Sequence, residues 1–405
     1  MTTRKHLKQL VRDRMRRTGE AYTVARRHVV GAGPTPPDAG WEPRGGLDGD
    51  TAALAAVLAN LGVVAPHTGE PLTEAMILGV GGGLGAGYIL WEFGDEHRRP
   101  RVLTLGFRRL WQYPDRWARE TAERLGLHAE VHETGGRRAA AAALDAQLDR
   151  GLPAIVWVDA YALGLHGEPD WLDGYGSPPV VVASRDGDGY VVDDRSPRTA
   201  IVSADRLAAA RARVGSYRNR LIAIDPGRVD LDLAPAVEAG LHAQVEHLSA
   251  ASDSFSLPAW RKWSRMTTDP RAPKGWPSVF ADGRGVASLR ASIVAGAGRG
   301  GHLRGAYADF LDEAAELVGR ERLRAAAAGW REAARRWDAV VDAALPPGDE
   351  LRIAIETGDP GRWDLQTRRD AEPDEPPAVG DAVRAVFNAE TTALARLREA
   401  VGPAD

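Results

Sequence analysis

Apolar residues at three- and four-residue spacing predict helices along much of the chain. The first strong example runs from Leu54 to Leu61, where Asp50 or Thr51 can cap the start and Gly62 ends the pattern. The start of such a helix presents backbone N–H groups that can stabilise a thiolate or an oxyanion. Further helices are predicted over residues 116–125, 138–150, 231–248, 257–266, 286–295, 303–318, 320–343 and 381–401.

Alternating and continuous apolar runs predict strands in the first half of the chain. Residues 126–133 alternate, and residues 152–163 have the pattern of a buried strand and its exit. Two valine-rich runs flank the glycine-containing turn at residues 186–189, which is typical of a hairpin. The pattern as a whole predicts an α+β fold, in which a small antiparallel sheet is followed by an all-α domain.

The length of the chain indicates more than one domain. It has 405 residues, of which 44% are hydrophobic, and this is enough for two cores. We expect a basic helical segment at residues 1–30, a Pro- and Gly-rich linker at 31–45, an α+β domain at 46–226 and a helical domain at 227–405. Within the helical domain, residues 348–377 are rich in Asp, Glu, Pro and Arg and are expected to form an exposed loop.

Charge and cysteine content narrow the classes of function. The net charge of −4 gives no global reason to expect a nucleic-acid partner, and the basic residues of segment 1–30 are expected on a solvated appendage or docking arm. No apolar run approaches the ~20 residues that span a bilayer, so we expect a cytoplasmic protein with no membrane partner. The chain has no cysteine, which excludes disulfides and any thiol mechanism.

Two short motifs suggest a cofactor or a metal, and both have a plainer interpretation. The glycine-rich run at residues 81–87 lacks the acidic residue about twenty positions on that a dinucleotide fingerprint requires, and no P-loop lysine follows it. His128, Glu130 and His132 alternate as in a two-His, one-carboxylate metal site, but we expect them on the solvent face of a half-buried strand. We therefore expect no cofactor and no metal.

Several segments together resemble a known family. They are Asp48-Gly-Asp-Thr-Ala-Ala-Leu54, the glycine-rich run at 81–87 and Val158-Asp-Ala-Tyr-Ala-Leu163. These segments resemble the butirosin biosynthesis protein H (BtrH) family, which is similar to papain-like leader peptidases and includes an acyltransferase. Residues 255–263, 274–277 and 300–311 resemble the helical domain that follows in such proteins, so the resemblance covers residues 46–405.

The resemblance implies a papain-like fold with a Cys, a His and an Asp, of which this sequence retains only the Asp. The position of the Cys, five residues before Leu54, holds Gly49. Counting back from the hairpin puts Pro178 at the position of the His, and the Asp is Asp194 or, with a one-residue slip, Asp193. Without the Cys and the His, the covalent route of the family cannot operate.

The ionisable side chains that remain are the candidates for acid–base chemistry. We expect Asp48, Asp50, Asp159 and Asp194 to be catalytic, because several carboxylates in one cleft raise some of their pKa values. Helix capping is the alternative for Asp48 and Asp50, and hydrogen bonding at strand ends is the alternative for Asp159 and Asp194. The predicted substrate-binding residues are Gly49, Thr51, Gly82, Gly83, Tyr88, Tyr161, His166, Pro178, His302 and Arg304.

Some of these residues also have a structural interpretation. His166 fits a surface loop, and His302 and Arg304 fit a structural role as well as contact with an anion or ligand. Core packing is the expected role of Trp260, Trp263, Trp276, Trp330 and Trp337.

These observations favour a protein of specialised-metabolite (antibiotic) biosynthesis that derives from a papain-like acyltransferase. It would act without a thiol on an acyl, aminoacyl or carrier-bound small substrate, by cyclisation, condensation or transfer. One alternative is a non-catalytic relative that binds a ligand or partners an active homologue. Another is acyl transfer by a hydroxyl of Thr51, Ser177 or Ser184. The expected partners are a small-molecule substrate, optionally an acyl carrier protein, and a second copy in a homodimer.

Overall fold

The computed structural model describes residues 40–91, 101–107, 113–227 and 231–402, and it divides into two compact units. Unit 1 comprises Met1–Leu72 and Trp111–Leu231, and unit 2 comprises Thr73–Leu110 and Asp232–Asp405. The predicted basic segment 1–30 and most of the predicted linker lie outside the described residues.

Unit 1 is built on a six-stranded sheet in which every pair of neighbouring strands is antiparallel. The strand order is β3-β8-β4-β5-β6-β7. The predicted hairpin joins β5 and β6, with Gly187 of its turn in the left-handed region (φ 58°). In sheet order, the strands are β3 (His128–His132), β8 (Leu221–Asp225), β4 (Ala154–Trp157), β5 (Pro179–Asp186), β6 (Gly189–Asp193) and β7 (Ala200–Ser203).

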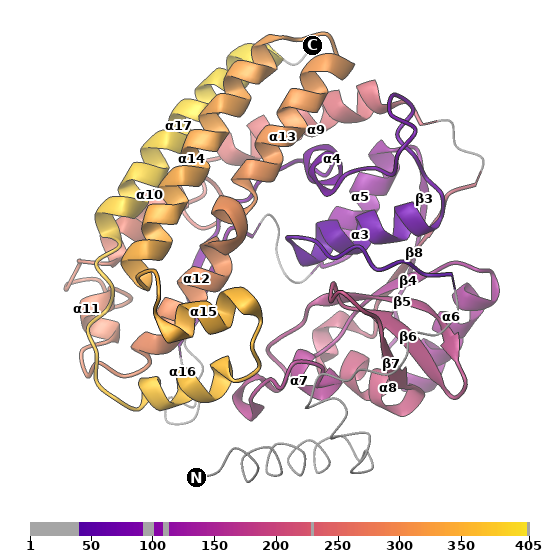
Figure 1. Ribbon diagram of the computed structural model, residues 1–405, viewed down its shortest axis with the longest axis horizontal. Helices are drawn as coiled ribbons and strands as arrows, with labels where there is room; N and C mark the ends of the chain where they lie inside the picture. The colour runs from indigo at the N-terminus through magenta and orange to yellow at the C-terminus, as the bar shows by residue number, and fades with distance from the viewer. Residues whose placement is uncertain (1–39, 92–100, 108–112, 228–230, 403–405) are drawn as a thin grey trace. The chain divides into compact units, whose positions relative to one another are not determined.

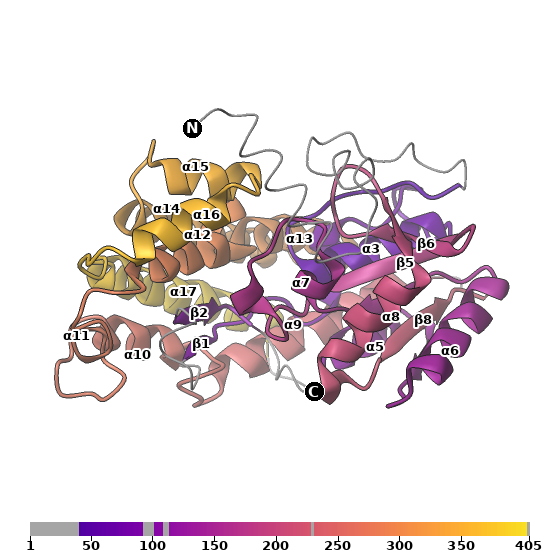
Figure 2. The same ribbon diagram turned by 90° about the horizontal axis from the view of Figure 1, so that it is seen from below.

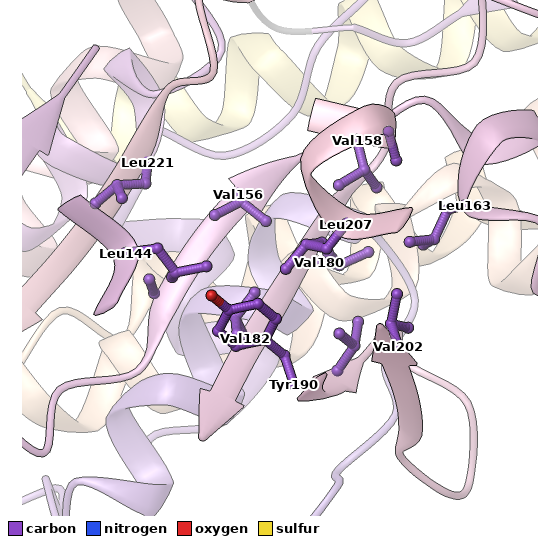
Figure 3. Packing of buried hydrophobic residues seen from close by; sticks show 13 residues of the cluster. Leu144, Val156, Val158, Leu163, Val180, Val182, Tyr190, Val202, Leu207 and Leu221 are labelled. Atoms are coloured by element: carbon purple, nitrogen blue, oxygen red, sulfur yellow. The ribbon is translucent and has the colours of Figure 1, made fainter. Parts of the chain in front are cut away.

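Helices cover this sheet on its faces (Figure 1). They are α3 (Gly49–Asn60), α5 (Arg116–Arg124), α6 (Arg137–Asp149), α7 (Ala160–Leu163) and α8 (Ala204–Arg213), with short 3-10 turns at Asp170–Leu172 and Gly215–Tyr217. One face of the sheet carries a buried cluster that includes Val156, Val180, Val182 and Leu207 (Figure 3). Since side chains alternate along a strand, Pro179 lies on the other face of β5, the face that packs on α3.

Unit 2 is helical, apart from a two-stranded antiparallel ribbon of β1 (Tyr88–Trp91) and β2 (Val102–Leu105). Helix α14 packs along α17, α13 and α12 (Figures 1 and 2). The five tryptophans predicted to lie in the core are fully buried. The helices are α4 (Glu74–Val80), α9 (Leu233–Ser249), α10 (Pro258–Met266), α11 (Trp276–Val279), α12 (Val286–His302), α13 (Arg304–Leu317), α14 (Arg322–Ala344), α15 (Glu350–Thr357), α16 (Arg362–Asp370) and α17 (Gly380–Val401).

The α+β fold class with an antiparallel sheet and a helical C-terminal region is therefore confirmed. The prediction of an exposed loop at 348–377 is wrong, because α15 and α16 lie there. Asp349 caps α15 by accepting hydrogen bonds from the backbone N–H groups of its first turn, and Leu351 is fully buried. The polar composition of this segment concealed two short helices that each bury a narrow face.

The predicted domain boundary at residue 226 differs from the division into units at one segment. Residues 73–110 were predicted to share a domain with residues 46–72, whereas the described residues among them belong to unit 2. Helix α4 packs on α9 and α13: Gly240 lets the backbones of α9 and α4 approach closely, and Gly79 leaves room for the Phe310 ring of α13. No helix in the part of the chain that the structure describes has the length and apolarity to cross a membrane.

Candidate acid–base site in unit 1

The N-terminus of α3 is closed by its own side chains. Asp48 is the N-cap, and its carboxylate accepts hydrogen bonds from the backbone N–H groups of Asp50 and Thr51, at 3.2 and 3.3 Å. The Thr51 side chain is fully buried, and its hydroxyl contacts the backbone and carboxylate oxygens of Asp48. The structure thus gives Asp48 the capping role that was the alternative to catalysis, and it leaves Thr51 no exposed surface for a substrate.

The position of the missing nucleophile faces a proline ring. A Cβ atom on Gly49 would lie 3.1 and 3.2 Å from the Cγ and Cδ atoms of Pro179. Pro178 instead precedes the strand, where its carbonyl oxygen accepts a hydrogen bond from the Val158 backbone. The side chain opposite Gly49 is therefore one residue further along than the predicted Pro178. The alternation of strand faces accounts for this difference, because counting back from a hairpin is sensitive to a slip of one residue.

The end of β6 carries two adjacent carboxylates with opposite environments. Asp193 pairs with Val181 across the β5–β6 ladder and therefore shares the sheet face of Pro179. Its carboxylate accepts hydrogen bonds from the indole Nε1 of Trp41 at 3.0 Å and from the backbone of Arg195 at 2.9 Å. Burial raises the pKa of Asp193, and these hydrogen bonds offset only part of that effect. Asp193 therefore lies on the face of the sheet that packs on α3, the same face as Pro179.

Asp194 forms an ion-pair-type contact with a histidine. The Nε2 atom of His166 lies 2.6 Å from Oδ2 of Asp194, and the Ser196 backbone donates to the other carboxylate oxygen at 3.1 Å. Burial alone would raise the pKa of Asp194, but the hydrogen bond and charge of His166, together with Ser196, hold it below its ordinary value. The His166 side chain is 49% exposed and that of Asp194 is 9% exposed. This is a buried carboxylate that orients a half-exposed imidazole.

Asp159, the fourth predicted catalytic residue, is fully buried between two backbone donors. One of its oxygens accepts a hydrogen bond from Ala162 and the other from Gly174, both at 2.8 Å. It is the N-cap of α7, directly after β4. Both oxygens are thus used by the chain itself, as the alternative of hydrogen bonding at a strand end requires.

Residues 50–195 match the family model described as butirosin biosynthesis protein H, N-terminal. The match supports the BtrH N-terminal family for this region. The match covers β5, β6 and the His166–Asp194 pair, and it confirms the predicted resemblance for this part of the chain. It also relates the chain to a protein of biosynthesis.

Two further comparisons add no functional argument. Residues 321–394 match the model described as TOBE domain, and in this structure they form α14, α15, α16 and most of α17. None of the curated proteins compared with the chain matches it.

The glycine-rich run of the BtrH region is packed inside unit 2. A Cβ atom on Gly83 would overlap Oε1 of Gln244 and would lie 2.7 Å from the ring of Tyr307. The same Gln244 side chain binds both the N–H and the carbonyl of Leu84. Gly82 and Gly83 have φ angles of 89° and 69°. The close approach that these glycines permit is therefore to the protein's own helices, and not to the ligand that was predicted there.

Tyr88 is also a core residue. Its ring stacks on Trp263 with centroids 5.8 Å apart, and its hydroxyl accepts a hydrogen bond from Trp276 at 3.2 Å. Burial raises its pKa to about 12, against a smaller lowering by Trp276. Tyr88 thus has a packing role in place of the predicted contact with a substrate.

Arg304, predicted to contact an anion, already has its anion within unit 2. Its guanidinium donates to both carboxylate oxygens of Glu390, at 2.8 and 3.1 Å, and to the carbonyl of Gly85 at 3.0 Å. Trp260 and Trp337 donate to the same carboxylate, and the Arg304 and Glu390 side chains are fully buried. His302 ends α12, and its side chain lies outside the described residues.

Tyr161 and the two candidate serines also lie in unit 1. Tyr161 is partly exposed in α7. The hydroxyls of Ser177 and Ser184 are buried without a hydrogen-bond partner among the described residues, so no base activates them there. The structure thus offers no support for acyl transfer by these two serines.

On strand β3, the carboxylate of Glu130 forms an ion pair with Arg150. Glu130 accepts a hydrogen bond from Arg150 at 2.8 Å and from Gln147 at 3.1 Å, and the Arg150 bond is the main reason why its pKa is lowered to about 2. His132 lies 3.5 Å from the same carboxylate. Over the described residues, no group of three or more His, Asp or Glu side chains is arranged to hold a metal ion.

The pairing of His166 with Asp194 was not predicted, because the two residues lie 28 positions apart on separate loops. One feature could have suggested it. His166 sits between Gly164 and Gly167, both with left-handed φ angles, in the loop that follows α7. Such a loop presents a side chain at the edge of the sheet.

Proposed function

We propose that this chain is a biosynthetic protein derived from a papain-like acyltransferase, and that it acts without a thiol on an acyl, aminoacyl or carrier-bound small substrate. The observation that carries the proposal is the 2.6 Å contact between His166 and Asp194. It supplies an oriented imidazole in a region whose family relationship is to a biosynthesis protein. Among the reactions predicted for the chain, acid–base transfer or condensation fits this group best.

The imidazole would serve as a general base and then as a general acid. An ionised Asp194 can only accept, so Nε2 of His166 carries the hydrogen of this bond and the lone pair of the neutral ring lies on Nδ1. Nδ1 would take the proton from an attacking amine as its nitrogen bonds to a thioester carbonyl. When the C–S bond breaks, the same proton would pass to the leaving thiolate. The substrate thiol would then leave, and an amide would remain.

A second candidate function is a non-catalytic relative that binds a ligand or partners an active homologue. The observation that favours it is the Pro179 ring against Gly49, which occupies the space where the family resemblance implies a thiol and a histidine. In that case His166 and Asp194 would be a surface contact only. The proposed partner of an enzyme is a small acyl substrate or its carrier protein, and that of a non-catalytic relative is the same ligand or an active homologue.

The test is product analysis by mass spectrometry. The full chain is incubated with acyl- and aminoacyl-phosphopantetheine thioesters and a panel of amines, beside the variants His166→Gln and Asp194→Asn. General acid–base catalysis contributes about 10²- to 10⁴-fold, so His166→Gln should lose turnover by that factor. Asp194→Asn should lose less, because the ring stays in place but is no longer oriented by a charge.

The matched control is His128→Gln, which changes a histidine that is 73% exposed on β3. It should keep wild-type turnover. Equal turnover in His166→Gln and wild type would refute the acid–base proposal. No turnover in any protein, combined with thermal stabilisation by a thioester, would instead support the binding relative.

A further inference from the structure

The segment that carries His166 is a closed loop on unit 1. Its two ends meet where the Ala160 backbone donates to the Gly176 carbonyl at 2.7 Å, and one step further out Val158 donates to Pro178 at 3.2 Å. The segment leaves β4 and returns to β5, which are neighbouring strands. Compact loops of this kind are packed by their own side chains and commonly carry functional residues.

A single buried carboxylate ties the two ends of this loop together. Asp159 accepts from Ala162 on the outgoing side and from Gly174 on the returning side, both at 2.8 Å. Its own backbone N–H donates to the Ala210 carbonyl of α8 at 3.0 Å, which fixes the carboxylate to the body of the unit. The Asp159 side chain has no exposed surface. A carboxylate is needed here because it is the one side chain of this size that accepts two hydrogen bonds on two oxygens.

A second contact at the same end of the loop is exposed and therefore weaker. Arg213 donates to Asp173 at 2.6 Å, and both side chains are more than a third exposed. Exposed ion pairs of this kind contribute little to stability because they are solvated and screened. The buried carboxylate of Asp159 is consequently the stronger constraint on the loop.

Two glycines fix the direction in which the loop presents His166. Gly164 ends α7 with φ 62°, and Gly167 has φ 72°, so the chain turns on both sides of the histidine. From this position the ring reaches Asp194 at the end of β6. The ring position therefore depends on how firmly the base of the loop is held.

We propose that Asp159 is a positioning residue for His166: by bridging the two ends of the loop, it holds the imidazole against Asp194. This inference rests on the proposed function of His166 for its catalytic meaning, but the structural coupling can be measured without turnover. It replaces the predicted proton transfer by Asp159 with an indirect role. A cap that only begins α7 would need just one of the two hydrogen bonds.

The experiment follows the His166 ring nitrogens by NMR in the full chain labelled with ¹⁵N-histidine, and the loop amides by hydrogen exchange. The main variant is Asp159→Ser, because serine can still cap α7 at Ala162 but cannot also bridge to Gly174. We expect its His166 signals to move toward those of Asp194→Ala, in which the contact is lost. The Gly174 amide should exchange about 10- to 100-fold faster, the effect of losing one charged hydrogen bond.

Two controls separate positioning from a loss of stability. Asp170→Asn makes the same loss of charge at an exposed site on the same loop and should leave the His166 signals unchanged. Asp349→Asn weakens the N-cap of α15 in unit 2, and it should lower the melting temperature without moving His166. His166 signals at wild-type positions in a folded Asp159→Ser variant would overturn the proposal.

The wild-type chain provides a test that no folding defect can obscure. In native-state hydrogen exchange, the amides of Ala162 and Gly174 should open together with those of residues 164–168, since one carboxylate holds both ends. Separate opening of the two ends would overturn the proposal.

If His166→Gln keeps full turnover while the NMR coupling is found, the proposed function fails and the positioning of His166 by Asp159 stands. If turnover depends on His166, Asp159→Ser should lower kcat with KM changed by less than about twofold.

Discussion

The two units use charged side chains in opposite ways. In unit 2 the Arg304–Glu390 pair is fully buried, and two tryptophan indoles complete the hydrogen bonds of the carboxylate. In unit 1 the His166–Asp194 pair joins a buried carboxylate to a ring that is about half exposed. The first pair has no surface with which to contact a substrate, whereas the second keeps the His166 ring in contact with solvent. Exposure, and not residue type, separates scaffold from candidate chemistry in this chain.

The largest expected effect is on the buried pair. Glu390→Gln removes the charge that compensates Arg304, and loss of one partner of a buried pair costs about 3–5 kcal/mol of unfolding free energy. Denaturant unfolding followed by the indole resonances of Trp260 and Trp337 measures this within unit 2. Glu238→Gln is the control, because its pair with Arg320 is partly exposed and should cost only about 0–1 kcal/mol. Equal losses in the two variants would contradict the contrast.

The next effect tests whether the glycine-rich run is a packed core. Gly83→Ala should cost about 2–4 kcal/mol, about 1–2 from the left-handed φ angle and the rest from the overlap with Gln244. Gly319→Ala has a similar φ angle (64°) in open space and should cost only the first part, about 1–2 kcal/mol. Thermal unfolding of both variants provides the comparison. A ligand-binding loop with room for a methyl group would show no difference between them.

Much of the fold could be predicted because it follows from local spacing. The helix predicted at 381–401 is α17 (Gly380–Val401), and the glycine-containing turn predicted the β5–β6 hairpin. The two short helices α15 and α16 were missed, because their buried faces are narrow within a polar segment. The grouping of residues 73–110 with the helical unit could not be predicted for another reason: the packing of a glycine-rich segment on distant helices leaves no periodic pattern in the sequence.

The candidate site was harder to predict, because its parts come from separate loops. The sequence placed Asp194 and His166 among the candidates, but nothing in their spacing brings them within hydrogen-bond distance. Arg304 and Tyr88 were expected to bind substrate, since a polar group near glycines fits a ligand site as well as a core. Only burial distinguishes these cases, and burial of a single side chain is set by the whole fold.

A smaller effect tests the position of the lost catalytic pair in unit 1. The chain has no cysteine, so Gly49→Cys introduces a single thiol. Adding Pro179→His should raise its alkylation rate by iodoacetamide at pH 6 by about tenfold, because a neighbouring imidazolium lowers the pKa of a thiol by a unit or more. Gly49→Cys with Pro178→His is the matched control and should react like Gly49→Cys alone. The opposite order of rates would mean that Pro178, and not Pro179, faces the start of α3.

The smallest expected effect separates the adjacent carboxylates of β6 by pH. The lowered pKa of Asp194 stabilises the native state above the unfolded pKa of about 3.9, and this contribution is lost as pH falls through the folded value. The raised pKa of Asp193 acts the other way: its contribution is present below about pH 3.9 and is lost as pH rises through the folded value. We therefore expect the difference in unfolding free energy between wild type and Asp194→Asn to become smaller on acidification. Over the same pH range, wild type should gain stability relative to Asp193→Asn. Denaturant unfolding between about pH 3 and 7, followed by a β6 resonance, measures both. Parallel curves for the two variants would mean that His166 does not stabilise the ionised form of Asp194. The contrast between the buried Arg304–Glu390 pair and the half-exposed His166–Asp194 pair would then lose its support in unit 1.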